Sequence, residues 1–330
     1  MLERTSGLQT VRRVAMLSLH TCPLANLGGR DTGGMNVYVR ELSRELARRS
    51  IHVDVFTHLR FEGAPTVVHD IPQFRVIHVP AGPAGPVSRE TLYHHVPDFV
   101  ENVDRFAREE SLRYDLVHAH YWLSGLAGIG LRRRWGAPLL TMFHTLARVK
   151  SRHMDVEETG LDRLRGSAEQ RVMDWSDRVV AANASERDEI LDLYRVDADK
   201  IRVSPLGVDP AMFFPRDKGV CRRELGIDAR NVIFAVARLE PLKGIETLLR
   251  SMALVFDQYP DRRADTAIII GGGPSEDGDT ASQDEMARLR ALADHLDLAP
   301  ETRFVGALHQ EQLPAYYGAA DVCVVPSFYE

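Results

Sequence analysis

Short apolar runs alternate with helical patterns along nearly the whole chain, and this alternation limits the possible folds more than any other feature. Residues 14–19 and 116–119 are typical of buried strands, and a helical pattern follows each of them. Strands that alternate with helices form parallel sheets covered by helices. The sequence therefore predicts an α/β protein built from doubly wound, Rossmann-like layers.

The same patterns give the expected elements in order. Pro97 lies inside the second helical pattern, so that helix must kink or restart there. The segment 146–160 is polar and shows no strand pattern. We expect strands at 14–19, 51–57, 74–79, 116–119, 139–143, 178–182, 201–203, 232–236, 267–270, 303–305 and 321–325, and helices at 34–49, 89–110, 123–135, 161–176, 184–194, 245–256 and 283–296.

The chain length indicates two domains, since 330 residues exceed one ordinary core. The stretch from Ser204 to Pro215 is rich in turn residues and separates two α/β series. We place the domain boundary there, with one domain at 1–207 and a second at 208–330. Tandem sheets of this kind place a cleft between them, and their ligands bind beyond the carboxyl ends of the strands.

Composition narrows the class of protein. The formal net charge of −6 argues against general nucleic-acid binding, which needs a basic surface. The three cysteines are far apart and form no zinc-ligand spacing, and no apolar run is long enough to span a bilayer. The polar start of the chain has no signal-peptide pattern. We therefore expect a cytoplasmic protein with no transmembrane segment; its oligomeric state is not indicated.

Glycines and polar residues gather where the expected strands end. Gly33 and Gly34 precede a helix on which Tyr38, Leu42 and Leu46 share one face. A glycine turn before a helix N-terminus can hold an anion, although it can equally be only a tight turn. The other strand-end residues are His120, Tyr121, His144, Thr145, Arg238, Lys243 and Gly271–Gly273.

These residue types suit a diphosphate and a sugar. Arg238 and Lys243 are five positions apart and could bind two phosphate charges, while Gly271–Gly273 would let the backbone approach a nucleotide. His120 and His144 could donate to, or exchange protons with, a sugar hydroxyl near neutral pH. For each residue alone, a structural or surface role is the better interpretation, and it is the pair of histidines at adjacent strand ends that shifts the balance toward a site.

An ordered set of motifs resembles the retaining glycosyltransferases of family four, which have the GT-B fold. The resemblance covers nearly the whole chain and is greatest to the group containing sucrose-phosphate synthase and the N-acetylglucosaminyl transferase of mycothiol synthesis. The motifs are Gly33-Gly34-Met-Asn-Val-Tyr-Val, His118-Ala-His-Tyr-Trp122, His144-Thr145, Val208-Asp209, Arg238-Leu-Glu-Pro-Leu-Lys243-Gly, Gly271-Gly-Gly-Pro and Pro326-Ser-Phe-Tyr-Glu330.

The resemblance implies hexosyl transfer from a nucleotide sugar, most simply a UDP-sugar, to a small hydroxylated acceptor. It also implies that the domain at 1–207 is on the acceptor side and that the domain at 208–330 binds the nucleotide sugar. It implies no cofactor and no metal, because cationic side chains and helix ends stabilise the leaving diphosphate. His120, His144, Arg238 and Lys243 match residues around the reacting groups. The matched donor-binding positions are Gly33, Gly34, Arg238, Lys243, Gly272, Gly273 and Glu330.

Members of the nearest group use sugar phosphates as acceptors, which implies a sugar phosphate or an inositol phosphate here. Those relatives carry a phosphate-binding lysine in a loop that here reads Ala84-Gly-Pro-Val-Ser-Arg-Glu90, without lysine. Arg89 is the candidate replacement, with a different geometry, so the phosphate acceptor stays open. The matched acceptor positions are Asn36, Tyr121, Thr145, Lys150 and Arg165.

The family pattern continues beyond Glu330 with a second glutamate and further helices. We therefore expect a truncated second domain, low stability and poor activity. Two alternatives stay open: a nicotinamide-dependent oxidoreductase, which lacks support because Gly28–Gly34 does not keep the GxGxxG spacing, and a non-catalytic nucleotide-sugar-binding fragment.

Overall fold

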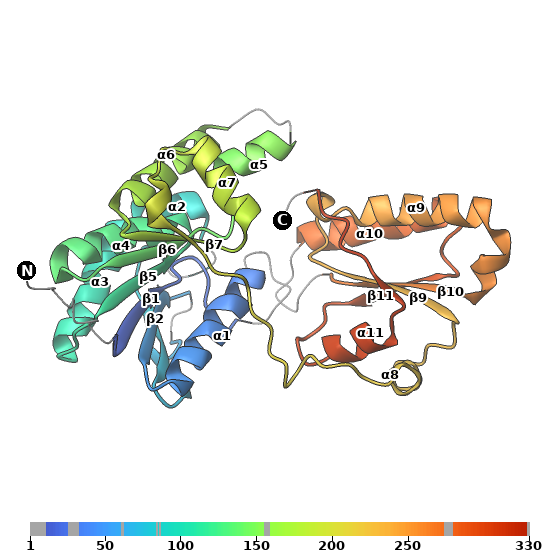
Figure 1. The fold of residues 1–330 in the computed structure, drawn as a ribbon, viewed down its shortest axis with the longest axis horizontal. Helices are drawn as coiled ribbons and strands as arrows, with labels where there is room; N and C mark the ends of the chain where they lie inside the picture. Colours follow the sequence, from blue (N-terminus) through green and yellow to red (C-terminus); the bar gives the residue numbers. More distant parts are fainter. Residues whose placement is uncertain are drawn as a thin grey trace, which may run out of the picture. The chain divides into compact units, whose positions relative to one another are not determined.

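The computed structural model describes residues 11–25, 33–60, 63–83, 85, 87–154, 159–273 and 280–328. The chain forms two compact units: among the described residues, the first contains 11–25 and those from 34 to 206, and the second contains residue 33 and those from 207 onward (Figure 1). Each unit contains its own sheet, as the two α/β series predict. The assignment of acceptor and donor to the two domains, and the cleft between them, stay predictions.

The first unit contains an eight-stranded sheet in the order β3-β4-β2-β1-β5-β6-β7-β8. Its pairings are parallel except for the antiparallel pair β3–β4 at one edge. The strands are β1 (Arg13–Leu17), β2 (His52–His58), β3 (Val67–Ile71), β4 (Phe74–Val79), β5 (Leu116–His120), β6 (Leu139–Met142), β7 (Arg178–Ala181) and β8 (Ile201–Val203).

The α-helices of this unit follow the expected order, with one addition, and a short 3-10 helix, η1, precedes β8. The expected restart at Pro97 is confirmed, since one helix ends at His94 and the next begins at Val96. A helix missing from the sequence prediction, α5, occupies most of the polar segment after β6. The helices are α1 (Gly34–Arg48), α2 (Arg89–His94), α3 (Val96–Glu109), α4 (Tyr121–Trp135), α5 (Ala147–Met154), α6 (Gly160–Trp175), α7 (Ala184–Leu193) and η1 (Ala198–Lys200).

Helix α1 packs on the sheet through a stripe beside the face that Tyr38, Leu42 and Leu46 share. Its buried residues are Asn36, Val39, Ser43 and Ala47, and the half-buried Leu42 and Leu46 pack against the same core. Small side chains let the helix approach β1 closely: the Ser43 hydroxyl donates to the Val39 carbonyl at 2.7 Å and lies 3.3 Å from the Met16 sulfur. The buried stripe is therefore narrow and partly polar, which hydrophobicity alone does not reveal.

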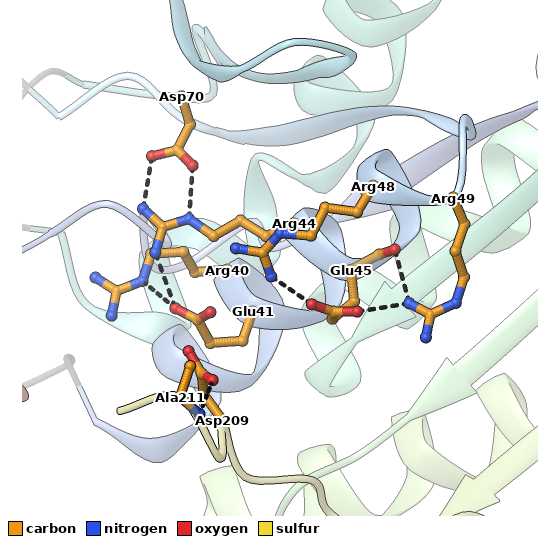
Figure 2. A network of polar contacts seen from close by, with 9 residues as sticks. All are labelled: Arg40, Glu41, Arg44, Glu45, Arg48, Arg49, Asp70, Asp209 and Ala211. Atoms are coloured by element: carbon orange, nitrogen blue, oxygen red, sulfur yellow. Dashed lines mark hydrogen bonds and ion pairs between the residues drawn. The ribbon is translucent and has the colours of Figure 1, made fainter. Parts of the chain in front are cut away.

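Ion pairs on α1 hold the sheet edge. Figure 2 shows the Arg44 guanidinium donating to both carboxylate oxygens of Asp70, at 2.7 and 3.0 Å, and also to Glu41. Asp70 belongs to β3, the antiparallel edge strand that the sequence analysis did not predict. A bidentate Arg–carboxylate pair is the strong form of a surface ion pair, so it fixes this short strand against α1.

The strand order places a switch point between β1 and β5. From β1 the chain proceeds through β2 toward β4 on one side, and then returns to add β5 on the other side. Ligands of doubly wound sheets bind at such a point, beyond the carboxyl ends of the two strands. The loop after β1, the start of α1 and the start of α4 lie there.

The second unit contains a four-stranded parallel sheet in the order β11-β10-β9-β12. Helices α9 and α10 pack on one face through Leu249, Leu289 and Ile270, and α8 and α11 on the other through Cys221, Phe234 and Ala319 (Figure 1). The elements are β9 (Asn231–Val236), β10 (Thr266–Gly271), β11 (Thr302–Gly306), β12 (Val322–Cys323), α8 (Lys218–Glu224), η2 (Pro241–Lys243), α9 (Ile245–Gln258), η3 (Pro260–Asp265), α10 (Thr280–His295) and α11 (Leu313–Ala319).

Within the described ranges, every helix is too short or too polar to cross a membrane.

Candidate functional site

In the first unit, Asn36 ties the start of α1 to the loop after β1. Its side-chain amide is almost fully buried and donates to Thr21 Oγ1 and to the Cys22 carbonyl, both at 2.7 Å. Gly33 lies just before α1 and Gly34 begins it. The predicted acceptor residue Asn36 therefore fixes the loop at the switch point, beside the helix N-terminus.

Tyr121 and His20 bring the β1 and β5 loops together. Their ring centroids are 4.5 Å apart, and the Leu19 N–H donates to the Ser124 hydroxyl one turn into α4. Tyr121 has a φ of 76°, a left-handed conformation that costs a non-glycine residue about 1–3 kcal/mol. Strain of this kind is concentrated at functional sites, which agrees with the predicted role of Tyr121.

Three histidines from β5 and from the loop after β6 form a row. His120 Nδ1 lies 3.0 Å from His144 Nε2, and the His118 and His120 ring centroids are 4.2 Å apart. Tyr38 of α1 lies edge-on to both His120 and His144. His144 also has a left-handed backbone, with φ of 62°. The structure thus brings the two predicted catalytic histidines into direct contact.

Burial changes the expected proton chemistry of this row. It lowers the pKa of His118 to about 4, and burial together with the charge of His118 lowers that of His144 to about 3. The pKa of His120 is also lowered, first by burial and then by His118 and His144. Both rings are therefore neutral near pH 7, which argues against the proton-exchange role; donation of a hydrogen bond to a sugar hydroxyl stays a prediction.

On the acceptor side, Arg165 of α6 joins Tyr121 to Thr145. Its Nη2 donates to the Thr145 carbonyl at 2.6 Å and to Thr145 Oγ1 at 2.9 Å, and its Cζ lies 4.8 Å from the Tyr121 ring centroid. The Cζ atom of Arg89 lies 5.7 Å from the same centroid. Arg89, the candidate replacement for the relatives' lysine, thus lies beside three predicted acceptor residues, Tyr121, Thr145 and Arg165. We call this place the acceptor point.

Positive charge surrounds this point. The pKa of His20 is far below its usual value, first because of burial and then because of charged neighbours that include Arg89, Arg60 and Arg165. Lys150, the remaining predicted acceptor residue, lies on the exposed surface of α5. Guanidinium groups and a hydroxyl around an aromatic ring form a site suited to a phosphate.

In the second unit, the predicted donor-side cations flank the turn between β9 and α9. Arg238 follows β9, and its Nη1 lies 3.0 Å from Glu240 Oε1. Lys243 ends η2, one residue before Gly244, which has φ of 66° and precedes the N-terminus of α9. A Cβ at Gly244 would lie 2.0 Å from the Pro326 carbonyl oxygen, so only glycine fits this approach of two backbone segments.

The backbone of the glycine run after β10 packs against the turn between β9 and α9. Gly272 has φ of 130°, and a Cβ there would lie 2.0 Å from the carbonyl oxygen of Ala237, beside Arg238. Gly273, with φ of 147°, passes the Met286 side chain. The cations and the predicted backbone contacts therefore share the carboxyl edge of this sheet, while Glu330 lies outside the described residues. Among those residues we find no cluster of three metal-ligating side chains.

Four residues that were not predicted from the sequence lie beside the predicted ones. His20 contacts Tyr121, Glu240 pairs with Arg238, and Glu169 and Tyr194 lie behind Arg165. Glu169 follows Arg165 by four residues on one helix, a spacing that signals an ion pair. The contacts of Tyr194 come from a distant segment and leave no local signal.

Two family profiles match this chain. A family profile described as Glycosyltransferase Family 4 matches residues 32–212, and one described as Glycosyl transferases group 1 matches residues 217–330. The chain is 39% identical over 322 residues to D-inositol 3-phosphate glycosyltransferase 2 of Catenulispora acidiphila, covering 97% of this chain and 74% of that protein. It is 42% identical over 322 residues to a D-inositol 3-phosphate glycosyltransferase of Geodermatophilus obscurus, covering 97% and 70%.

Among solved structures, the chain resembles sucrose-phosphate synthase from Thermosynechococcus elongatus, with a TM-score of 0.84 and 31% identity. The superposition covers 97% of this chain and 76% of that one. The predicted two-domain α/β architecture of GT-B type is thereby confirmed.

Proposed function

The chain belongs to glycosyltransferase family 4, and we propose that it moves a hexosyl unit, with retention at the anomeric carbon, from a nucleotide sugar to a phosphorylated polyol. The acceptor is an inositol phosphate or a hexose phosphate. The predicted enzyme class, a glycosyltransferase, is confirmed by the family, and the oxidoreductase alternative is set aside.

One observation carries the acceptor proposal: the meeting of Arg165, Thr145 and Tyr121, with the Arg89 guanidinium nearby. An acceptor phosphate bound there would accept hydrogen bonds from guanidinium and hydroxyl groups. The relatives named for D-inositol 3-phosphate support this class of acceptor.

We assign the donor to the carboxyl edge of the second sheet. Arg238 and Lys243 would bind the diphosphate, Gly272 and Gly273 would let it approach the backbone, and the N-terminus of α9 would add its dipole. UDP is the proposed nucleotide. Gly33, Gly34 and Glu330 are proposed to complete the donor site.

In the proposed reaction, the bond between the sugar anomeric carbon and the diphosphate oxygen breaks, and a bond to the acceptor hydroxyl oxygen forms on the same face. The hydroxyl proton passes to the departing phosphate oxygen. Arg238 and Lys243 stabilise the charge that develops on the diphosphate, and this is the main source of rate enhancement. His144, held neutral, orients a sugar hydroxyl. We propose that no metal is required and that the protein works in the cytoplasm.

The test is a matrix of donors and acceptors. UDP-, ADP- and GDP-sugars are each incubated with inositol 3-phosphate, glucose 6-phosphate, fructose 6-phosphate and unphosphorylated inositol, with and without a chelator. We expect an α-linked product and nucleoside diphosphate release with one donor and one phosphorylated acceptor, unchanged by the chelator. Transfer to unphosphorylated inositol alone would overturn the acceptor assignment, and chelator-sensitive activity restored by a divalent ion would overturn the metal assignment.

A further inference from the structure

Glu169 of α6 is a fully buried carboxylate placed directly behind the acceptor point. One of its oxygens accepts from Arg165 Nε at 2.7 Å, and the carboxylate also accepts the Ala147 N–H, at 3.0 Å to the nearer oxygen. The Tyr194 hydroxyl donates to it as well. Burial of an ion is costly unless it is paired and hydrogen-bonded, and these donors supply the partners that Glu169 needs.

The partners of Glu169 hold the loop that carries His144 from two sides. Arg165, fixed by Glu169, donates to the Thr145 carbonyl and hydroxyl, and Ala147 is the first residue of α5. Glu169 therefore acts on Thr145 and on the start of α5, whereas the His144 ring is held by His120.

A second set of contacts fixes the carboxylate itself. The Tyr194 hydroxyl accepts the Arg148 N–H at 3.3 Å, and Arg148 Nη1 donates to the Leu193 carbonyl at 2.6 Å at the end of α7. The Arg148 guanidinium also lies over the Tyr194 ring, 4.6 Å from its centroid. Glu169 thus joins α5, α6 and α7.

We propose that Glu169 is a positioning residue for the anionic group of the acceptor: it holds the Arg165 guanidinium and the Thr145 hydroxyl in the arrangement that binds a phosphate. The proposal rests on the function proposed above and deepens its acceptor site. Glu169 serves to position these groups rather than to stabilise the fold, since a buried ion pair contributes little net stability compared with well-packed apolar residues.

The test compares Glu169→Gln with a matched control, Asp54→Asn. Asp54 is also a buried carboxylate of the first unit, bonded to Arg13, Arg75 and the Tyr114 hydroxyl, but it lies near the amino end of β2. Both changes replace a buried, arginine-paired carboxylate with an amide. Both are expected to lower the melting temperature.

Only the first change should alter acceptor kinetics. For Glu169→Gln we expect KM for inositol 3-phosphate to rise about tenfold or more, with kcat within about threefold and KM for the UDP-sugar within about twofold of wild type. For Asp54→Asn we expect both KM values to stay within about twofold. An unchanged acceptor KM in folded Glu169→Gln, or an equal rise in Asp54→Asn, would overturn the proposal.

Two further arms keep the proposal testable. If Glu169→Gln does not fold, Glu169→Asp retains the charge but is too short to reach Arg165 and Ala147 together, and its acceptor KM should rise about threefold; a wild-type KM would contradict the proposal. If the wild-type protein makes no product from inositol 3-phosphate, the proposed function fails. The inference is then tested by calorimetric binding of inositol 3-phosphate with UDP present. Equal affinities of wild type and variants, or no binding by wild type, would overturn it.

Discussion

His120 Nδ1 lies 3.0 Å from His144 Nε2, and the second of these two rings belongs to the loop after β6 and is half-buried. His120 is fully buried in β5, and its Nδ1 faces His144. Because both rings are neutral near pH 7, the contact is a hydrogen bond between one donor and one acceptor nitrogen. It fixes the tautomer and orientation of His144.

This relationship predicts different effects for the two histidines. His144→Ala should lower kcat about 100-fold, because the sugar hydroxyl loses its partner, and His120→Ala should lower it about tenfold by loosening His144. His120→Asn, which places an amide near the Nδ1 position, should recover most of that loss. Steady-state kinetics of the three variants measures this. If His120→Asn were as impaired as His120→Ala, the hydrogen bond would not be the cause.

The buried histidines also predict how stability depends on pH. His118 and His144 have folded-state pKa values of about 4 and about 3, below the ordinary 6.5, so the unfolded chain binds protons that the folded protein does not. The free energy of unfolding should therefore fall as the pH drops through about 6.5, by up to about 1.4 kcal/mol per pH unit for each such histidine.

Urea unfolding at about pH 7 and about pH 5.5 measures this slope. His118→Phe removes one titrating group and should reduce the slope by about one proton. The same slope in wild type and His118→Phe would show that His118 is protonated equally in the folded and unfolded states.

The fold and the site differ in how far local sequence reveals them. The parallel strands were predicted because each is an apolar run between turn residues, and the strand-end rule then located His120, Tyr121 and His144. Strand β3 was missed because it is short, of mixed polarity and half-exposed. Its position depends on the distant pair between Arg44 and Asp70.

Helices α5, α8 and α11 were missed for related reasons. Each has eight residues or fewer, and α5 is mostly polar. The start of α5 depends on Glu169, which accepts the Ala147 N–H from 22 residues away. The lowered histidine pKa values likewise come from burial, which follows from tertiary packing. Local patterns therefore predict elements and strand-end residues, but they miss the contacts that set protonation and orientation.

Adding a single methyl group at Gly272 should strongly destabilise the backbone around it. A Cβ there would lie 2.0 Å from the Ala237 carbonyl oxygen, and the φ of 130° is unfavourable for any other residue. Gly272→Ala should destabilise the second unit by about 3 kcal/mol and abolish UDP binding. Gly207→Ala, where a Cβ meets no atom within 4 Å, is the control and should be near neutral. Equal melting temperatures for the two variants would contradict this reading of the glycine turn.

Replacing Arg238 should weaken donor binding without lowering the stability of the protein. Its side chain is 37% exposed and its pairing with Glu240 is a surface ion pair, so Arg238→Ala should change the free energy of unfolding by less than about 1 kcal/mol. UDP should raise the melting temperature of wild type but not of this variant, and kcat should fall about 100-fold. Lys218→Ala is the control, since it removes another exposed cation of the same unit, one that pairs with Asp321 near the amino end of β12. A shift with NAD but not with any nucleoside diphosphate would argue against the donor assignment.

The acceptor site is the central claim, and one comparison tests it most directly: kcat/KM for inositol 3-phosphate divided by that for unphosphorylated inositol, in wild type and in Arg165→Ala. Arg165 donates to Thr145 and lies over Tyr121, where the phosphate is proposed to bind. We expect a ratio of about 100 or more in wild type that falls about tenfold or more in Arg165→Ala, with KM for the donor unchanged. A ratio near one in wild type, or one that Arg165→Ala leaves unchanged, would contradict the proposed site.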